Sequence, residues 1–229
     1  MKKYLKDLLL GIYAGAAIAL GGLLNIIAKT LLSDVSLSWV PTLFGSLLFP
    51  IGLTLVCYLG LNLFTGKIGY LLDKDKEYLK FLGIIYVGNI IGSLFAGFLA
   101  LLVFKNVPSL YNVALAIGNK KAASVTNFQD SVNTFAGSCL CGMLVYLAVL
   151  CYKTFNRHVF KVIGIFVAIA TFVYFGFDHC VANMFYFTFA LKFTDPFSYL
   201  NIAIATLGNT VGAIAINALY NLIKKSTNK

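Results

Sequence analysis

Long apolar runs separated by short polar segments make up most of this chain. Six runs approach the roughly 20 apolar residues that a helix needs to cross the hydrocarbon core of a bilayer. The predicted spans are Leu8–Leu32, Val40–Asn62, Tyr78–Phe104, Val132–Tyr152, Val159–Leu191 and Tyr199–Ile223. The fifth run is too long for one straight helix. It also contains Asp178 and His179, and hydrocarbon tolerates such side chains only where they face water or a partner.

The composition agrees with a membrane protein and excludes soluble and disordered classes. Of the 229 residues, 60% are hydrophobic and 11% are charged, and the mean hydropathy is +0.87. A soluble domain has about 25% charged residues. We therefore expect a single all-α transmembrane domain over residues 1–229. The five cysteines lie in apolar runs without C-x-x-C or zinc-ligand spacing, so we expect no metal site and no cofactor.

The positive charges predict how the chain sits in the membrane. Thirteen of the 18 Lys and Arg residues lie in segments on the side of the two termini. The five on the other side are Lys29, Lys105, Lys120, Lys121 and Lys192. Because Lys and Arg collect in cytoplasmic loops, we expect both termini in the cytoplasm of a cell (inner or plasma) membrane. This bias also explains the net charge of +10 without nucleic acid as a partner.

Three short motifs recur in the same order in the two halves of the chain. They are Gly88-Asn89 and Gly208-Asn209 at an offset of 120, Ala14-Gly15 and Ala136-Gly137 at 122, and Gly60–Gly66 and Gly176–His179 at 116. Each half holds three spans, an odd number, so the second half is inverted relative to the first. The pattern predicts inverted repeats over about residues 8–104 and 132–223, an architecture of transporters and channels.

Transporters with inverted repeats place broken helices at matching positions beside their binding site. The second and fifth spans supply such breaks, predicted at Asn62–Gly66 and Gly176–Asn183. The G-x-x-x-G spacings that begin at Gly88 and Gly208 are interpreted as close helix packing. The candidate site therefore lies where the two breaks meet.

His179 is the strongest candidate for chemistry. It lies at membrane depth beside Asp178, and an imidazole titrates near neutrality, so it can pass protons to a weak acid. The alternative is a structural histidine that ties two broken helices together through neutral hydrogen bonds. Thr65 and Asn183 lie at or beside the breaks, where they either satisfy free backbone groups or line a path. These alternatives stay open from the residues alone.

Several motifs together resemble one family. Residues 177–185, F-D-H-C-V-A-N-M-F, are similar to the F-E-H-S-V-A-N-M-F signature of the formate–nitrite transporter family. Residues 63–66, L-F-T-G, resemble the L-F-T loop of that family's broken second helix. The Gly-Asn pairs at 88–89 and 208–209 also fit, and the resemblance extends from about Leu8 to Tyr220.

The resemblance implies an aquaporin-like protomer with six spans, assembled as a homopentamer with a pore in each protomer. The implied substrates are small monovalent anions of weak acids, such as formate, nitrite or hydrosulfide. His179 would be the central pore histidine, Thr65 its hydrogen-bond partner, and Asp178 and Asn183 parts of a polar network behind the pore. The resemblance also implies a cytoplasmic-side apolar constriction at Phe49, Leu53 and Phe172 and a periplasmic-side one at Leu63 and Phe64.

Three departures from the family pattern bear on substrate choice. Asp178 replaces the usual Glu, and Gly142 replaces the Asn of a fourth-span L-C-N motif. Thr126 stands where an ungapped match puts a vestibule lysine, and Lys121 lies five residues earlier. Lys121 is therefore a candidate for attracting anions in the vestibule, with a solvated loop charge as the alternative.

The residues and the resemblance together predict a channel or transporter rather than an enzyme. Basic vestibules would concentrate an anion, and apolar constrictions would oppose its bare charge. Protonation at His179, from the ring or through water, would produce a neutral acid that can cross. The alternatives are a pore for neutral solutes such as water or glycerol, although N-P-A repeats are absent, and a structural or sensory membrane protein without transport.

Overall fold

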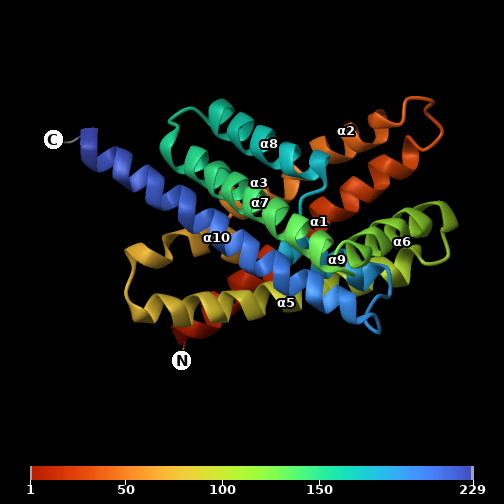
Figure 1. The fold of residues 1–229 in the computed structure, drawn as a ribbon, viewed down its shortest axis with the longest axis horizontal. Helices are drawn as coiled ribbons and strands as arrows, with labels where there is room; N and C mark the ends of the chain where they lie inside the picture. The colour runs from red at the N-terminus through yellow and green to blue at the C-terminus, as the bar shows by residue number, and fades with distance from the viewer. Residues whose placement is uncertain (1, 228–229) are drawn as a thin grey trace.

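The computed structural model describes residues 2–227, and this part of the chain is helical with no strand (Figure 1). Six apolar helices are long enough to cross a membrane, which confirms the predicted number of spans. Their bounds are α1 Lys2–Leu31, α2 and α3 together Trp39–Tyr58, α5 Lys76–Phe104, α7 Phe128–Thr154, α8 His158–Phe175 and α10 Pro196–Thr227. Between α2 (Trp39–Leu48) and α3 (Pro50–Tyr58), Pro50 interrupts the hydrogen bonding because it has no N–H.

The remaining helices are shorter. They are α4 Phe64–Lys67, the 3₁₀ helix η1 Ile68–Asp73, α6 Pro108–Ala123 and α9 Cys180–Phe189. The sequence analysis did not predict α6, whose 16 residues carry too many polar side chains for a span. In Figure 1 both chain ends lie toward the left, whereas α6 and the connection from α1 to α2 lie at the opposite end.

The helices of the second and fifth spans are interrupted near the predicted positions, and each interruption contains a glycine with left-handed backbone. Helix α3 ends before Gly60, with φ +64°, and α8 ends at Gly176, with φ +75°. Such φ angles favour glycine because it has no Cβ. The offset of 116 residues between the two glycines confirms this part of the predicted repeat. The break in the second span, however, covers residues 59–63 rather than Asn62–Gly66, because Phe64–Lys67 already forms a helical turn. The break in the fifth span is shorter than predicted and covers residues 176–179.

One asparagine in each half satisfies the backbone groups that a break leaves free. Asn89 accepts from the Phe64 N–H at 2.8 Å and donates to the carbonyls of Asn62 and Gly11 at 2.9 and 2.8 Å. Asn209 makes the same three contacts in the second half. It accepts from the Cys180 N–H at 3.0 Å and donates to the carbonyls of Asp178 and Ser138, at 2.8 and 2.9 Å. Buried backbone groups need such partners, so these asparagines stabilise the breaks.

The matching contacts correct one part of the predicted repeat. Gly15 of α1 packs on the backbone of Asn89, and Gly142 of α7 packs in the same way on Asn209. The equivalent of Gly15 is therefore Gly142, at an offset of 127, and not Gly137 at 122. The structure confirms that the G-x-x-x-G glycines mediate close packing, since those beginning at Gly88 and Gly208 contact the backbones of α1 and α7. Where the two repeats begin and end remains a prediction.

Candidate functional site

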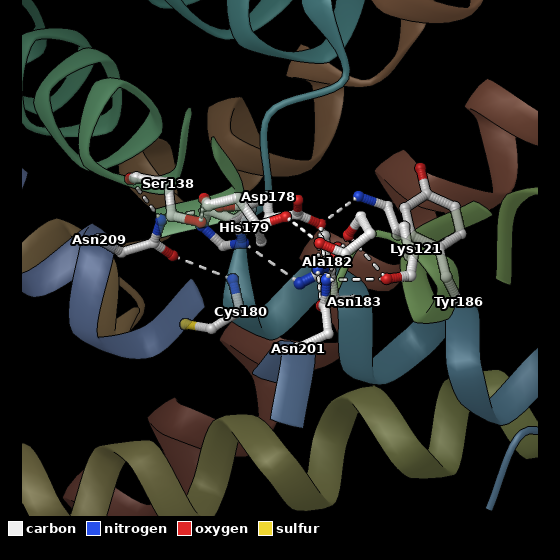
Figure 2. A network of polar contacts seen from close by, with 12 residues as sticks. Lys121, Ser138, Asp178, His179, Cys180, Ala182, Asn183, Tyr186, Asn201 and Asn209 are labelled. Carbon is white, nitrogen blue, oxygen red and sulfur yellow. Dashed lines mark hydrogen bonds and ion pairs between the residues drawn. The ribbon is translucent and has the colours of Figure 1, made fainter. Parts of the chain in front are cut away.

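His179 lies where the two broken helices meet, and it contacts both of them (Figure 2). It is the N-cap residue of α9, and its Nδ1 accepts the backbone N–H of Ala182 at 3.1 Å. Its Nε2 lies 2.8 Å from Oγ1 of Thr65 in α4, a residue 114 positions away in the chain. The imidazole therefore does for α9 what an Asn or Ser side chain does at other helix starts.

These contacts define the protonation of the ring. Because Nδ1 of His179 accepts a hydrogen bond, the proton of the neutral ring lies on Nε2, which donates to the Thr65 hydroxyl. The structural alternative considered for His179, a residue that ties two broken helices together, thus describes what the ring does.

Asp178, next to His179, anchors a polar cluster that links four segments of the chain. Its Oδ1 pairs with Nζ of Lys121 from α6 at 2.7 Å and accepts from Nδ2 of Asn183 in α9 at 2.6 Å. Asn183 also donates to Oδ1 of Asn201 in α10 at 2.7 Å, and Figure 2 shows these side chains converging. Asn201 in turn donates to the Lys121 carbonyl at 3.1 Å. The cluster holds Lys121 beside the break.

A cavity of about 140 Å³ opens at this cluster. Its walls come from α1, α6, α8, α9 and the junction between α2 and α3, and they carry three lysines and one acidic residue. The lysines are Lys29, Lys120 and Lys121, and the acid is Asp178. His179 lines the same cavity, so the ring borders open space as well as the two broken helices. The described residues contain no group of three His, Cys, Asp or Glu side chains that could hold a metal ion.

Two phenylalanine rings meet at the wall of this cavity. Phe49 and Phe172 line the cavity, are 2% and 3% exposed, and meet edge to face with centroids 5.7 Å apart. The ring of Phe172 also stacks on His179, with centroids 5.9 Å apart. The structure thus brings together two of the predicted constriction residues and the predicted central histidine.

The side of the membrane on which this constriction lies depends on the orientation of the chain. Phe49 and Phe172 share a cavity with Lys29 and Lys121, which lie in the last turns of α1 and α6. In Figure 1, α6 and the end of α1 lie at the end of the molecule away from the chain termini. The prediction of cytoplasmic termini and the prediction of a cytoplasmic constriction at Phe49 and Phe172 are therefore incompatible. With the termini in the cytoplasm, this pair faces the outside. Spacing along the chain could not show this, because it does not reveal on which side of His179 a residue lies.

The other predicted constriction residues are buried in the core. Leu53 and Leu63 are each 1% exposed, and Phe64 is 8% exposed with its ring 4.7 Å from that of Tyr86. Phe64 begins the short helix that leads toward the end of the molecule where the chain termini lie. A constriction at these three residues remains a prediction.

The structure adds site residues that sequence reasoning missed. Asn209 was noticed only as part of a repeated Gly-Asn pair, and Asn201 and Asn25 were not considered. The signal was present, since each is an amide side chain within an apolar run. Lys121, the candidate for attracting anions, lines the cavity and forms an ion pair with Asp178.

Comparison with known proteins identifies the family. The family model described as "Formate/nitrite transporter" matches residues 2–223. The chain belongs to the formate/nitrite transporter family. It is a multi-pass membrane protein, and its relatives in this family are channels and transporters.

Individual relatives support the assignment. The chain is 33% identical to the uncharacterized transporter YrhG of Bacillus subtilis, with 93% of this chain and 83% of the relative covered. It is 32% identical to a probable formate transporter of Methanothermobacter thermautotrophicus, with 94% and 87% covered. A solved structure, "Pentameric formate channel with formate bound", matches with a TM-score of 0.80 at 28% identity and covers 97% of this chain and 98% of that chain. The relatives thus span almost the whole chain.

Proposed function

We propose that this protein carries small monovalent anions of weak acids, of the formate, nitrite or hydrosulfide type, across the cell membrane. We also propose that it works as a homopentamer with a pore in each protomer, as the pentameric formate channel suggests. The observation that carries the proposal is one cavity whose walls bring three lysines, two facing phenylalanine rings and a buried histidine together.

The first step is attraction of the anion. Lys29, Lys120 and Lys121 face one cavity in which Asp178 is the single acidic side chain among the described lining residues. A cleft with an excess of one charge and low-dielectric walls raises the local concentration of the opposite charge. Anions therefore accumulate next to the Phe49–Phe172 pair.

The second step is selection against bare charge. An ion that passes between Phe49 and Phe172 loses its hydration, and burying a charge costs far more than burying a neutral polar molecule. The protonated acid crosses this point at a much lower cost. The anion consequently takes up a proton before it passes the rings.

The hydrogen bonds of His179 support water as the source of this proton. The neutral ring has one N–H proton, on Nε2, and a ring that gave it away would be left as an imidazolate anion. Acceptance of a second proton would require Nδ1 to give up the Ala182 N–H at the positive end of α9. His179 and Thr65 then act as hydrogen-bonding groups that solvate the passing acid.

Stopped-flow uptake into proteoliposomes tests the proposal. Formate, nitrite and hydrosulfide are compared over a range of pH, with glycerol and water as neutral solutes. Above the pKa of each acid we expect uptake at constant total anion to rise about tenfold for each unit of decreasing pH, because the neutral fraction rises by that factor. With water as the proton source, the midpoint of the profile follows the pKa of the acid and differs among the three anions.

The outcomes separate the alternatives. One common midpoint for all three acids would contradict protonation through water and point to the His179 ring as the donor. Flux of water or glycerol without the anions would indicate a neutral-solute pore. No flux of any solute would contradict transport. His179→Ala is expected to slow the uptake of all three acids.

A further inference from the structure

Asn25 of α1 carries a polar group that nothing in the described protein satisfies. The residue lines the cavity and is 1% exposed. Its Oδ1 accepts from the Tyr186 hydroxyl at 3.4 Å, while its Nδ2 finds no hydrogen-bond partner among the described residues. A buried donor left without a partner destabilises the folded protein, so such a group marks a place where a ligand or water binds.

Lys29 stands one helical turn from Asn25 on the same face of α1. Residues spaced i, i+4 are neighbours on a helix surface, and both Asn25 and Lys29 line the cavity. Lys29 is half-buried and makes no ion pair within residues 2–227, whereas the charge of Lys121 is compensated by Asp178. Gly45 of α2 faces both side chains without a side chain of its own. The cavity thus contains an uncompensated cation next to a free amide donor.

We propose that Asn25 and Lys29 form a binding subsite for a monovalent oxyanion with two acceptor oxygens, such as a small carboxylate or nitrite, on the approach to Phe49 and Phe172. This inference rests on the proposed transport function and assigns its point of substrate capture. One oxygen accepts from Lys29 Nζ and the other from Asn25 Nδ2. The cavity of about 140 Å³ has room, since a single water requires ~10–15 Å³ by the same measure.

The subsite discriminates between classes of substrate. Two donors spaced by a helical turn match an anion that spreads its charge over two oxygens. Hydrosulfide has a single sulfur, a weak acceptor, and occupies one donor while leaving the other unsatisfied. The subsite therefore favours oxyanions over hydrosulfide, and the preference depends on Asn25 more than on the general positive charge of the cavity.

Binding is tested on the purified full-length protein without reference to transport. Thermal unfolding in detergent is followed in sodium formate and in sodium chloride of equal ionic strength. A ligand that binds the folded state raises the midpoint, so formate is expected to raise it above the chloride value. The formate-specific increase should disappear in Asn25→Leu, and it should shrink more in Lys29→Gln than in Lys120→Gln. The last variant removes one charge from the same cavity and leaves the two donors in place.

Uptake by proteoliposomes supplies the second measurement. In Asn25→Leu the half-saturating concentration of formate should rise about tenfold or more, the value of a hydrogen bond to a charged group. That of hydrosulfide should change less than about twofold. Lys29→Gln should weaken formate capture more than Lys120→Gln does. If Asn25→Leu does not assemble, the comparison of the two lysine variants decides.

The results distinguish this inference from the transport proposal. Equal shifts for formate and hydrosulfide in Asn25→Leu, or equal effects of Lys29→Gln and Lys120→Gln, would overturn the subsite. So would unfolding midpoints that are the same in formate and chloride. Wild-type protein that binds formate but carries no flux would overturn the transport proposal and leave the subsite standing.

Discussion

Asp178 illustrates how one residue can tie the site to the helices around it. Its Oδ1 takes the Lys121 ammonium from α6 and the Asn183 amide from α9, and its backbone carbonyl accepts from Asn209 of α10. The side chains of Asp178 and Lys121 are 9% and 14% exposed. Water can therefore solvate the remaining charge only weakly when one partner is removed. The shorter Asp in place of the family's usual Glu therefore still reaches its lysine.

We predict that Asp178→Asn destabilises the protein by about 3 kcal/mol, because breaking a buried pair leaves a lysine without its counter-charge. Asp178→Glu keeps the charge and should cost less. The double variant Asp178→Asn with Lys121→Met should recover most of the loss. Unfolding in detergent measures all three. A double variant as unstable as the sum of its single changes would show that the pair contributes no coupling energy.

At the scale of elements, the two helix breaks depend on how closely their supporting helices approach. Asn209 of α10 contacts the break in the fifth span, and Gly142 lets α7 lie directly against the Asn209 backbone. A Cβ at position 142 would overlap that backbone. The departure from the family's L-C-N motif is thus accompanied by a contact that tolerates no side chain.

Gly142→Ala is expected to cost about 1–3 kcal/mol through overpacking, and Gly142→Asn, which restores the family residue, should cost more. Gly83 provides the matched control because it lies inside α5 with nothing within 4 Å of an added Cβ. Gly83→Ala should be neutral or stabilising by about 0.5–1 kcal/mol. Thermal unfolding of the detergent-solubilised proteins compares them. A tolerated Gly142→Asn would mean that α7 and α10 separate readily.

At the scale of the whole molecule, the cavity and the chain termini lie at opposite ends. Lys29, Lys120 and Lys121 lie in the last turns of α1 and α6, at the end of the molecule away from the termini. The sequence analysis assigns 13 of the 18 basic residues to segments on the side of the termini. If the positive charges orient the chain as they do in other membrane proteins, the lysine-lined cavity opens to the outside. Anions arriving from outside then meet the proposed subsite first.

A green fluorescent protein fused to the C-terminus of the full chain tests this orientation. We predict strong fluorescence in bacterial cells, because the fusion stays in the cytoplasm where the reporter folds. A periplasmic alkaline phosphatase fused at the same point should be inactive. The opposite pair of results would place the lysine-lined cavity on the cytoplasmic side and return the Phe49–Phe172 pair to the side implied by the family resemblance.

Hydrophobicity along the chain was enough to predict the six spans and the existence of two breaks. Long apolar runs are a local property, and bilayer thickness converts them directly into helices. In the structure, Gly60 and Gly176 lie at the breaks in a backbone conformation that suits glycine. The helix α6 was missed because a short polar helix outside the spans has no comparable constraint on its composition.

The candidate site was only partly predictable for the same reason. Asp178, His179 and Asn183 lie close together in the chain, and their polarity within an apolar run was visible in the sequence. Lys121, the partner of Asp178, was not visible there, since it lies 57 positions away. Thr65 lies 114 positions from His179, and only the family resemblance gave it as the partner of the ring. Whether these side chains meet depends on how α4 and α6 pack against the break in the fifth span.

The sequence by itself determined the class of the molecule, its number of spans, the places where two of them break and the asymmetry of its charges. These features follow from residue types and local spacing, which the bilayer acts on directly. Tertiary structure alone decided that α7 meets α10 at Gly142, that Nδ1 of His179 caps α9, and that Phe49 and Phe172 face the lysines. Those contacts join distant segments, and their geometry is set by the packing of whole helices.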